Sequence, residues 1–571
     1  MKNKTRHREY ISTFFRGNKL AYCAMLLTSI LFSVLNLAAA WLIQQLVDNV
    51  SGEPGALSLS VLTVLTAGII LLIIPIKGLQ YWAQPQFMKK ALSQFKSFAF
   101  RELTRKNIAS FQSEDTSTYI SAFSNDLTSV ETNYLDKQDV LVFNIVWAAG
   151  AVVLMLLYSP ILAAIAIGLC ALPFLASMRQ GARMEKVEKT VSEKNGEFTA
   201  SLKDILSGFS IIKSFRAEGA AVSLLEQSSS AVETAKCQKR KLSVLLGMIG
   251  DIASFSAQMG TFLAGAVLAY LGWGITPGIL FVFMDLTGAV ITVVSQMPEL
   301  LASRRAALGL VDKMARTLEL NVRDEGKDIP NCLENGISVH NLCFGYESDN
   351  EILHDINIDF KAGKSYAIVG NSGSGKSTLL KLLMASRHDY KGAICYDNTE
   401  LMGISSKSLY ELVSMVEQNV FVFDASIRDN ITMFRDFPTA DVDRAIELSG
   451  LSRLIDERGV NYLCGENGKN LSGGEKQRIA IARSLLQKSS VLLADEVTAA
   501  LDAQTAYQVT GDILKLDGIT RIVVTHSLVE SLLKQYDGII VLKDGHIVES
   551  GMFDDLMDEK GYFYALYTVA Q

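Results

Sequence analysis

The octapeptide GNSGSGKS, residues 370–377, matches the full spacing of a loop that binds phosphate groups. Glycines let the backbone N–H groups of such a loop approach phosphate oxygens, the lysine neutralises the β and γ oxygens, and the serine hydroxyl can ligate Mg²⁺. The expected nucleotide contacts are Gly370, Asn371, Ser372, Gly373, Ser374, Gly375, Lys376, Ser377 and Thr378, with Ser377 also a metal ligand. The motif therefore predicts a site for a nucleoside triphosphate and Mg²⁺.

Two carboxylates follow a second apolar run, VLLAD, which ends at Asp495 and is followed directly by Glu496. Consecutive strand residues point to opposite sides, so the two acids can have different tasks. Asp495 would face Mg²⁺, and Glu496 would face the water that attacks the γ-phosphate. An acidic pair at a strand end is otherwise an ordinary solvated turn, but beside a phosphate loop the catalytic interpretation is favoured.

A second stretch suited to a phosphate is LSGGEKQR, residues 471–478, where a serine and two glycines precede a helical sequence. Helix N-termini leave backbone N–H groups unpaired and carry about half a positive charge, so a glycine-rich entry lets an anion bind there. The chain thus has two places for the same kind of group, and this duplication needs an explanation.

The elements that must position these motifs are those of an α/β domain. The run SYAIVG, residues 365–370, has the composition of a buried strand, and STLLKLLMA, residues 377–385, that of a helix, which is the setting a phosphate loop requires. Before about residue 320, by contrast, long apolar runs dominate a chain that is 49% hydrophobic over 571 residues. We expect a membrane all-α six-helix domain followed by an α/β P-loop ATPase domain.

Six apolar runs are long enough to cross a bilayer, which takes about 20 residues of helix. They are residues 20–47, 57–82, 140–158, 161–178, 244–271 and 277–301. Lys and Arg gather at the N-terminus, in 83–139, in 179–243 and at Arg304 and Arg305, whereas the loops around 51–58, 159 and 272–274 contain neither. Because positive charge favours the cytoplasmic side, both termini and the ATPase domain are expected in the cytoplasm.

The expected domains follow from these runs. They are a cytoplasmic N-terminal helix along the membrane surface (1–19), a transmembrane domain whose helices extend beyond the lipid (20–315), a linker (316–335) and a nucleotide-binding domain (336–571). A net charge of −6 gives no support for nucleic acid as a partner. Seven cysteines without a CxxC pair suggest neither a disulfide framework nor a zinc site.

Taken together, the motifs resemble those of the ATP-binding cassette (ABC) superfamily. The whole chain resembles a half-transporter of the exporter type (type IV fold), in which six membrane helices precede one cassette. The motifs occur in the family's order: Phe344-Gly345-Tyr346, the phosphate loop, Gln418, GEN before LSGGE, VLLADE, AALD at 499–502, and His526. The resemblance implies that the LSGGE signature of one chain binds the ATP held by the phosphate loop of a second chain, which explains the duplicated site and requires a dimer.

The resemblance also implies residue roles. Tyr346 stacks on adenine, Ser472, Gly473 and Gly474 contact the partner's γ-phosphate, and Asp502 crosses the dimer interface. Gln418 senses Mg²⁺ and the attacking water beside Asp495, His526 bonds the γ-phosphate, and Glu496 is the base. Without the family, Tyr346, Gln418 and His526 would be read as ordinary strand or surface residues. Glu475 stands where the family commonly has Gln, and AALD where SALD is usual, but no phosphate donor is lost, so hydrolysis is expected.

Coupling and cargo have candidates too. By resemblance, short segments near 118–126 and 205–215 lie across the cassettes, the second mainly on the partner's. Asp285 is about 12 Å into the sixth span. Charge within a span is unfavourable and often functional, so Asp285 either favours cationic or zwitterionic cargo or makes an interhelical hydrogen bond.

The expected function is ATP-driven export of an amphipathic peptide, drug-like compound or lipid, with ATP and Mg²⁺ as cofactors. Two alternatives stay open: an importer of siderophore-like cargo with the exporter-type fold, and a membrane-tethered ATPase that gates or senses without moving cargo. The expected partners are the lipid bilayer, the cargo and a second half-transporter chain, as a homodimer or a heterodimer. Short outer loops suggest a bacterial cytoplasmic membrane.

Overall fold

A computed structural model describes residues 2–178, 181–319, 326–347, 350–497, 501, 503–516 and 518–570. The chain forms two compact units. The first comprises Met1–Leu103 and Thr116–Glu319, and the second comprises Thr104–Asp115 and Leu320–Gln571. Each unit is described by itself.

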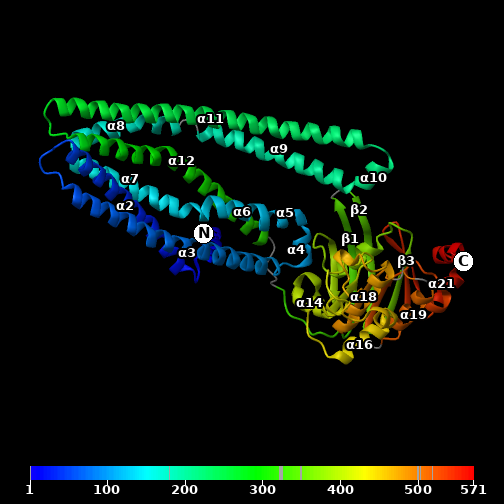
Figure 1. Cartoon of the computed structure of the whole chain (residues 1–571). Helices are drawn as coiled ribbons and strands as arrows, with labels where there is room; N and C mark the ends of the chain where they lie inside the picture. Colours follow the sequence, from blue (N-terminus) through cyan, green and yellow to red (C-terminus); the bar gives the residue numbers. More distant parts are fainter. Residues whose placement is uncertain are drawn as a thin grey trace. The chain divides into compact units, whose positions relative to one another are not determined.

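The first unit is built of helices that run alongside one another (Figure 1). They are α1 (Lys2–Phe15), α2 (Lys19–Val50), α3 (Leu59–Leu103), α5 (Thr116–Ser121), the π-helix η1 (Ala122–Asp126), α6 (Leu127–Val130), the π-helix η2 (Glu131–Leu135), α7 (Lys137–Tyr158), α8 (Pro160–Met178), α9 (Gly181–Ser207), α10 (Phe209–Ser214), α11 (Glu218–Tyr270) and α12 (Pro277–Glu319).

The six predicted spans lie in α2, α3, α7, α8, α11 and α12. Within the described residues, five helices are long and apolar enough to cross a membrane, and α8 has 19 residues that are almost all apolar. Helix α3 has 45 residues, or about 68 Å at 1.5 Å per residue, against a hydrocarbon core of about 30 Å. This helix therefore extends well beyond a bilayer, as predicted. Only 6% of the most apolar 18-residue stretch of α3 is buried within the chain, as expected of a surface that faces lipid or another chain.

Helix α1 packs on other helices through its aromatic side chains. Tyr10 and Phe14 are buried. The Phe14 ring stacks on Phe95 of α3 at 4.4 Å, and the Tyr10 ring meets Phe98 edge-on at 5.0 Å. Aromatic pairs at these distances add to the apolar burial of the two helices. The location of α1 at a membrane surface stays a prediction.

A buried carboxylate joins the end of α2 to the start of α12. Asp48 Oδ1 accepts a hydrogen bond from Gly278 N at 2.9 Å, and Oδ2 accepts one from Gln44 Nε2 at 2.5 Å. The Gly278 N–H belongs to the first turn of α12, which has no intrahelical acceptor, so a carboxylate is well placed there. A Cβ at Gly278 would lie 2.4 Å from the Gln44 carbonyl oxygen, so only glycine permits this approach.

The second unit contains two sheets (Figure 1). The four-stranded antiparallel sheet has the order β2-β1-β4-β5, and the six-stranded sheet β10-β9-β3-β8-β7-β6 is parallel except for β10. The strands are β1 (Gly336–Glu347), β2 (Asn350–Lys361), β3 (Ser365–Gly370), β4 (Lys391–Tyr396), β5 (Thr399–Glu400), β6 (Val413–Val416), β7 (Val491–Asp495), β8 (Thr520–Val524), β9 (Gly538–Lys543) and β10 (His546–Gly551). The helices are α4 (Ile108–Gln112), α13 (Lys376–Leu383), η3 (Leu401–Gly403), α14 (Ser406–Leu412), α15 (Ile427–Thr432), α16 (Thr439–Leu448), α17 (Ser452–Arg458), η4 (Glu466–Gly468), α18 (Gly473–Gln487), α19 (Ala503–Leu514), α20 (Glu530–Leu533), α21 (Phe553–Glu559) and α22 (Tyr562–Ala570).

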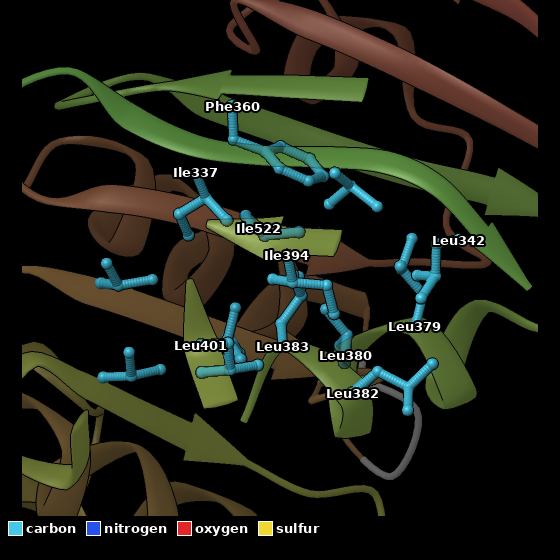
Figure 2. Close-up of a cluster of buried hydrophobic side chains, with 14 of the residues drawn as sticks. Ile337, Leu342, Phe360, Leu379, Leu380, Leu382, Leu383, Ile394, Leu401 and Ile522 are labelled. Carbon is cyan, nitrogen blue, oxygen red and sulfur yellow. The ribbon is translucent and has the colours of Figure 1, made fainter. Parts of the chain in front are cut away.

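Helix α13 is anchored between the two sheets by leucines. Leu379, Leu380, Leu382 and Leu383 are fully buried in one apolar cluster (Figure 2). Members of both sheets complete the cluster, including Ile337, Phe360, Ile394 and Ile522. Because the last two residues of the phosphate loop are the first two residues of α13, this core fixes the loop's exit.

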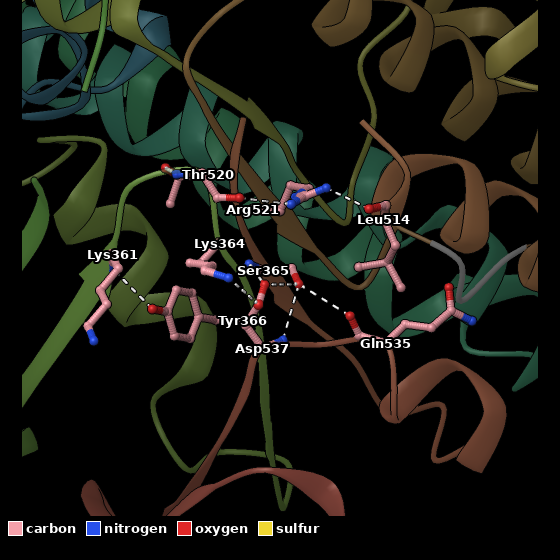
Figure 3. A network of polar contacts seen from close by, with 10 residues as sticks. Lys361, Lys364, Ser365, Tyr366, Leu514, Thr520, Arg521, Gln535 and Asp537 are labelled. Atoms are coloured by element: carbon pink, nitrogen blue, oxygen red, sulfur yellow. Dashed lines mark hydrogen bonds and ion pairs between the residues drawn. The ribbon is translucent and has the colours of Figure 1, made fainter. Parts of the chain in front are cut away.

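A polar network holds the other end of β3 (Figure 3). The Asp537 carboxylate accepts hydrogen bonds from Ser365 N at 2.8 Å, Ser365 Oγ at 3.0 Å and Lys364 Nζ at 2.9 Å. Arg521 on β8 donates to the carbonyl oxygens of Leu514 and Leu516, both at 2.6 Å. The Asp537 bonds hold the start of β3, and the Arg521 bonds join β8 to the end of α19 and the residues after it.

The second unit includes the segment Thr104–Asp115, which the sequence did not predict. Ile108 N donates to Tyr410 Oη at 3.0 Å, and Asn107 Nδ2 lies 3.5 Å from His388 Nε2. The predicted segment 118–126 lies in α5 and η1 of the first unit, and its contact with a cassette stays a prediction. Helix α4 has only five residues and no apolar periodicity of its own, so its position depends on these long-range contacts. The other predicted segment does contain a short helix, α10.

Candidate ATP-binding site

The phosphate loop connects the buried strand β3 to α13, and three glycines shape it. Gly370, Gly373 and Gly375 have φ values of 150°, 82° and 97°. A Cβ at Gly370 would lie 2.1 Å from the Leu542 carbonyl oxygen, and one at Gly375 would lie 2.6 Å from Leu353 Cδ2. At Gly373 a Cβ would meet nothing within 4 Å, so this part of the loop faces open space. The loop can therefore approach a ligand there with its backbone.

Two polar side chains inside the loop suit an anionic ligand. Lys376 Nζ donates to the carbonyl oxygens of Gly370 at 2.9 Å and Asn371 at 2.8 Å, so the ammonium group is held within the loop. Burial lowers the pKa of Lys376, and the acidic residues Glu496 and Asp495 oppose this shift. Ser374 Oγ is buried and has no hydrogen-bond partner in the described part of the chain. A phosphate would supply the acceptor for both groups, so these residues fit a nucleotide.

An oxygen pair lies at the end of the loop. Ser377 Oγ donates to Asp495 Oδ1 at 2.9 Å, which brings the first turn of α13 to the end of β7. Burial raises the pKa of Asp495, and the hydrogen bond from Ser377 acts in the opposite direction. Hydroxyl and carboxylate oxygens are the ligands that Mg²⁺ uses beside nucleotide phosphates, so this pair fits the predicted metal site.

Glu496, Gln418 and His526 meet at the ends of β7, β6 and β8. Glu496 Oε2 accepts a hydrogen bond from Gln418 Nε2 at 2.7 Å, and Oε1 lies 2.8 Å from His526 Nε2. Glu496 has φ = 50°, in the left-handed region, which costs a non-glycine residue about 1–2 kcal/mol. This backbone turn accompanies the separation of two adjacent acids, with Asp495 at Ser377 and Glu496 at Gln418 and His526.

Tyr346 is half exposed at 47% on β1. The Phe344 ring meets it edge-on at 5.1 Å, and the Arg387 guanidinium lies 5.5 Å from its ring centre. A ring supported in this way can offer a face to a base. No sequence motif marks Arg387, which lies beyond the end of α13 and reaches Tyr346 only through the fold.

The signature forms a capped helix N-terminus. Ser472 Oγ accepts from Glu475 N at 3.3 Å, and Glu475 Oε2 accepts from Ser472 N at 2.6 Å, which makes a reciprocal capping box. Glu475, the residue that departs from the family's usual Gln, therefore has a local structural role. Ser472 and Gly473 are exposed, so the helix N-terminus lies at the surface of the chain.

The structure brings some predicted site residues together and leaves others apart. Lys376, Ser377 and Asp495 lie with the phosphate loop, and Glu496, Gln418 and His526 form a second cluster beside Asp495. The signature helix α18 contributes to a different apolar core, with Ile427, Val442 and Leu454, from the core that holds α13. Asp502 lies outside the described residues. Asp285 is exposed on α12, between the buried residues Phe283 and Leu286.

Comparisons with known proteins place these sites in a family. The model of the ABC transporter transmembrane region matches residues 22–294, and the ABC transporter model matches residues 353–499. An ATP-dependent lipid A-core flippase of Photobacterium profundum is 30% identical over 411 residues, covering 68% of this chain and 67% of that one. The chain belongs to the ABC transporter family.

Two further similarities extend over nearly the whole transporter. An ATP-dependent lipid A-core flippase of Desulfotalea psychrophila is 26% identical over 554 residues, 95% of each chain. A structure described as a bacterial Atm1-family ABC exporter with ATP bound matches with a TM-score of 0.83 and 25% identity, covering 97% of this chain and 98% of that one. The transporter is a multi-pass half-transporter with one nucleotide-binding domain, and it couples ATP hydrolysis to export.

Proposed function

We propose that the chain works as a homodimer that binds two ATP molecules between its cassettes and exports an amphipathic, lipid-like molecule. The observation that carries the proposal is the separation of two phosphate-binding features on one chain: the loop at Gly370–Ser377 and the exposed, capped N-terminus of α18. Each suits a phosphate: the loop leads into α13, whose leucines are buried in one core, and the signature leads into α18, whose Ile479 and Ala482 are buried in another. Two copies facing one another would complete two sites.

The residues of the proposed site divide the chemistry among themselves. Lys376 and the loop N–H groups bind the β and γ oxygens, Tyr346 supports the base, and Ser472 to Gly474 contact the γ-phosphate held by the partner. Ser377, Asp495 and Gln418 would hold Mg²⁺, which supplies charge neutralisation when bound. Glu496 accepts the proton of the attacking water, and His526 positions that carboxylate and bonds the γ-phosphate. Asp502 is proposed to cross the interface.

The cargo class rests on the relatives and on the helical unit. Two relatives are named as lipid A-core flippases, which favours a lipid-like amphiphile over a soluble cargo. Asp285 is exposed on α12, where it would add a negative charge to the path of a cationic or zwitterionic group. The lysines and arginines of the sequence support a cytoplasmic location for both termini and the ATPase domain, and the proposed membrane is a bacterial cytoplasmic membrane.

The test is ATP-dependent uptake into inside-out vesicles that contain this chain alone. The panel comprises labelled lipids, lipophilic cations and peptides, with Glu496→Gln as the inactive variant and Glu530→Gln, an exposed glutamate, as the matched control. We expect uptake of a lipid or lipophilic cation by the wild type and by Glu530→Gln, and none by Glu496→Gln.

Other outcomes distinguish the alternatives. ATP hydrolysis without flux of any probe would favour a gating or sensing ATPase, and ATP-driven flux out of the vesicles would favour import. Inactive protein that co-purifies with a second cassette chain would replace the homodimer with a heterodimer.

A further inference from the structure

We propose that Arg483 is a positioning residue that mechanically links Gln418, at this chain's own nucleotide, to the signature Ser472–Gly474, which serves the partner's nucleotide. The inference rests on the proposed two-chain arrangement. It assigns a task to a side chain in the middle of α18 that belongs to neither phosphate-binding feature.

The Arg483 guanidinium makes three hydrogen bonds to one neighbouring segment. Nε donates to the Asn430 carbonyl oxygen at 2.6 Å, and one terminal nitrogen, Nη1, donates to the Phe421 carbonyl oxygen at 2.7 Å. The other, Nη2, donates to Asn430 Oδ1 at 2.7 Å. A planar group with donors in a fixed fork sets both distance and orientation, which the single ammonium of a lysine cannot do.

Asn430 extends this clamp along the segment. It is fully buried on α15, and its Nδ2 donates to the carbonyl oxygens of Phe423 and Ser426, both at 3.0 Å. Its Oδ1 also accepts from Phe423 N at 2.8 Å. The amide thus holds both backbone groups of Phe423, so residues 421–430 form one piece attached to α18.

Gln418 is close to this piece along the chain. Three residue steps separate it from Phe421, a reach of at most about 11 Å. Its Nε2 is at the same time bonded to Glu496 Oε2 at 2.7 Å. A movement of α18 therefore pulls on Phe421 directly and on Gln418 through a short tether.

Breaking the hydrogen bonds of Arg483 to residues 421–430 is expected to require considerable free energy. Burial lowers the pKa of Arg483, in keeping with its removal from water. Carbonyl acceptors that lose this donor without gaining water are left unsatisfied. The segment is thus expected to move with α18, so that docking of the signature on one ATP repositions Gln418 at the other. This is a coupling between two nucleotide sites in the thermodynamic sense.

The test compares Arg483→Lys with Arg521→Lys in the full-length chain. Arg521 is a matched control because it too donates to backbone carbonyl oxygens in the second unit, those of Leu514, Leu516 and Gly363, but on β8. ATP hydrolysis is measured against ATP concentration. We expect sigmoidal curves for the wild type and Arg521→Lys, and for Arg483→Lys a hyperbolic curve with kcat about tenfold lower, as for a misplaced catalytic group.

A double-mutant cycle with Gln418→Ala tests the route. If Arg483 acts through Gln418, the double variant hydrolyses ATP no more slowly than Gln418→Ala alone. If the reductions in kcat caused by Arg483→Lys and Gln418→Ala multiply in the double variant, the proposal is overturned. It is also overturned if Arg483→Lys and Arg521→Lys have equal melting temperatures and equally sigmoidal curves. If Arg483→Lys does not fold, Asn430→Leu removes the amide that holds Phe423 and accepts from Arg483 Nη2, at a similar side-chain size, and the same loss of sigmoidicity is expected.

The measurement is independent of cargo. A hyperbolic wild-type curve would overturn the coupling itself. Failure of every probe in the vesicle assay would count against export of those molecules and would leave the result on ATP hydrolysis standing.

Discussion

His526 Nε2 lies 2.8 Å from Glu496 Oε1, so the proposed base is held on one oxygen by an imidazole while Gln418 holds the other. Both oxygens of the Glu496 carboxylate therefore have a side-chain partner before any water is bound. The arrangement is a resting state in which the base is oriented before substrate chemistry begins.

From this relationship we predict that His526→Ala lowers kcat for ATP hydrolysis by about 100-fold, because it removes both the orientation of Glu496 and a γ-phosphate contact. KM for ATP is expected to change little, since Tyr346 and the phosphate loop are intact. His546→Ala, at an exposed histidine of the same unit, is the control. Unchanged kcat in His526→Ala would remove His526 from the site.

Asp495 is predicted to lower the stability of the nucleotide-free fold at neutral pH while being required for ATP hydrolysis. Burial raises its pKa, so the folded nucleotide-free chain holds the proton more tightly than the unfolded chain does. The stability contribution of this group is therefore greatest below the unfolded pKa of about 4 and is lost as the pH rises through the folded pKa. At neutral pH, Asp495→Asn should raise the melting temperature while abolishing Mg²⁺-dependent hydrolysis.

The check on Asp495 is a melting curve at two pH values. The gain from Asp495→Asn over the wild type should shrink as the pH is lowered towards 4, because the raised pKa makes the wild-type carboxyl take up its proton before the unfolded chain does. Asp512→Asn, at an acidic residue on α19 in the same unit, serves as control. A lower melting temperature at neutral pH would contradict the argument.

Glu475 is predicted to weaken the association of the two cassettes. Its carboxylate lies at the N-terminus of α18, where it opposes an incoming phosphate, yet its capping bond needs only an acceptor oxygen. Glu475→Gln keeps that acceptor and removes the charge, worth about 0.3–1 kcal/mol at a helix terminus. In the hydrolysis-deficient Glu496→Gln background, half-maximal ATP for dimer closure should fall about two- to fivefold. An unchanged or higher value would show that the carboxylate does not face the phosphate.

Asp285 is predicted to select cargo charge. Asp285→Asn should reduce ATP-driven uptake of lipophilic cations several-fold and leave basal ATP hydrolysis unchanged, because an exposed carboxylate on α12 attracts a cation where an amide does not. Asp251→Asn, an exposed aspartate on α11, is the matched control. If both variants transport every cationic probe at the wild-type rate, Asp285 has no part in selection.

Local patterns predicted most of the fold and of the nucleotide site. The phosphate loop, the pair Asp495 and Glu496, and the six apolar runs each carry their information in consecutive residues, and the elements formed where expected. The sequence did not predict the segment 104–115, because a five-residue helix has no periodicity and its place depends on Tyr410 and His388. It did not mark Arg387 or Arg483 either. Their partners are an aromatic ring and backbone carbonyls far along the chain, and neither leaves a pattern in sequence.

The bond between Asp48 and the first turn of α12 has a consequence for how the helices part. A carboxylate bonded to a helix N-terminus is held firmly while the site is dry, since neither side then has another partner. Once water enters, it can satisfy both sides, and the net worth of the bond falls to that of an exposed interaction. The Asp48–Gly278 bond thus holds α2 against α12 while it is dry and weakens when water enters. Gly278 is needed for this bond because a side chain there would keep the two helices too far apart.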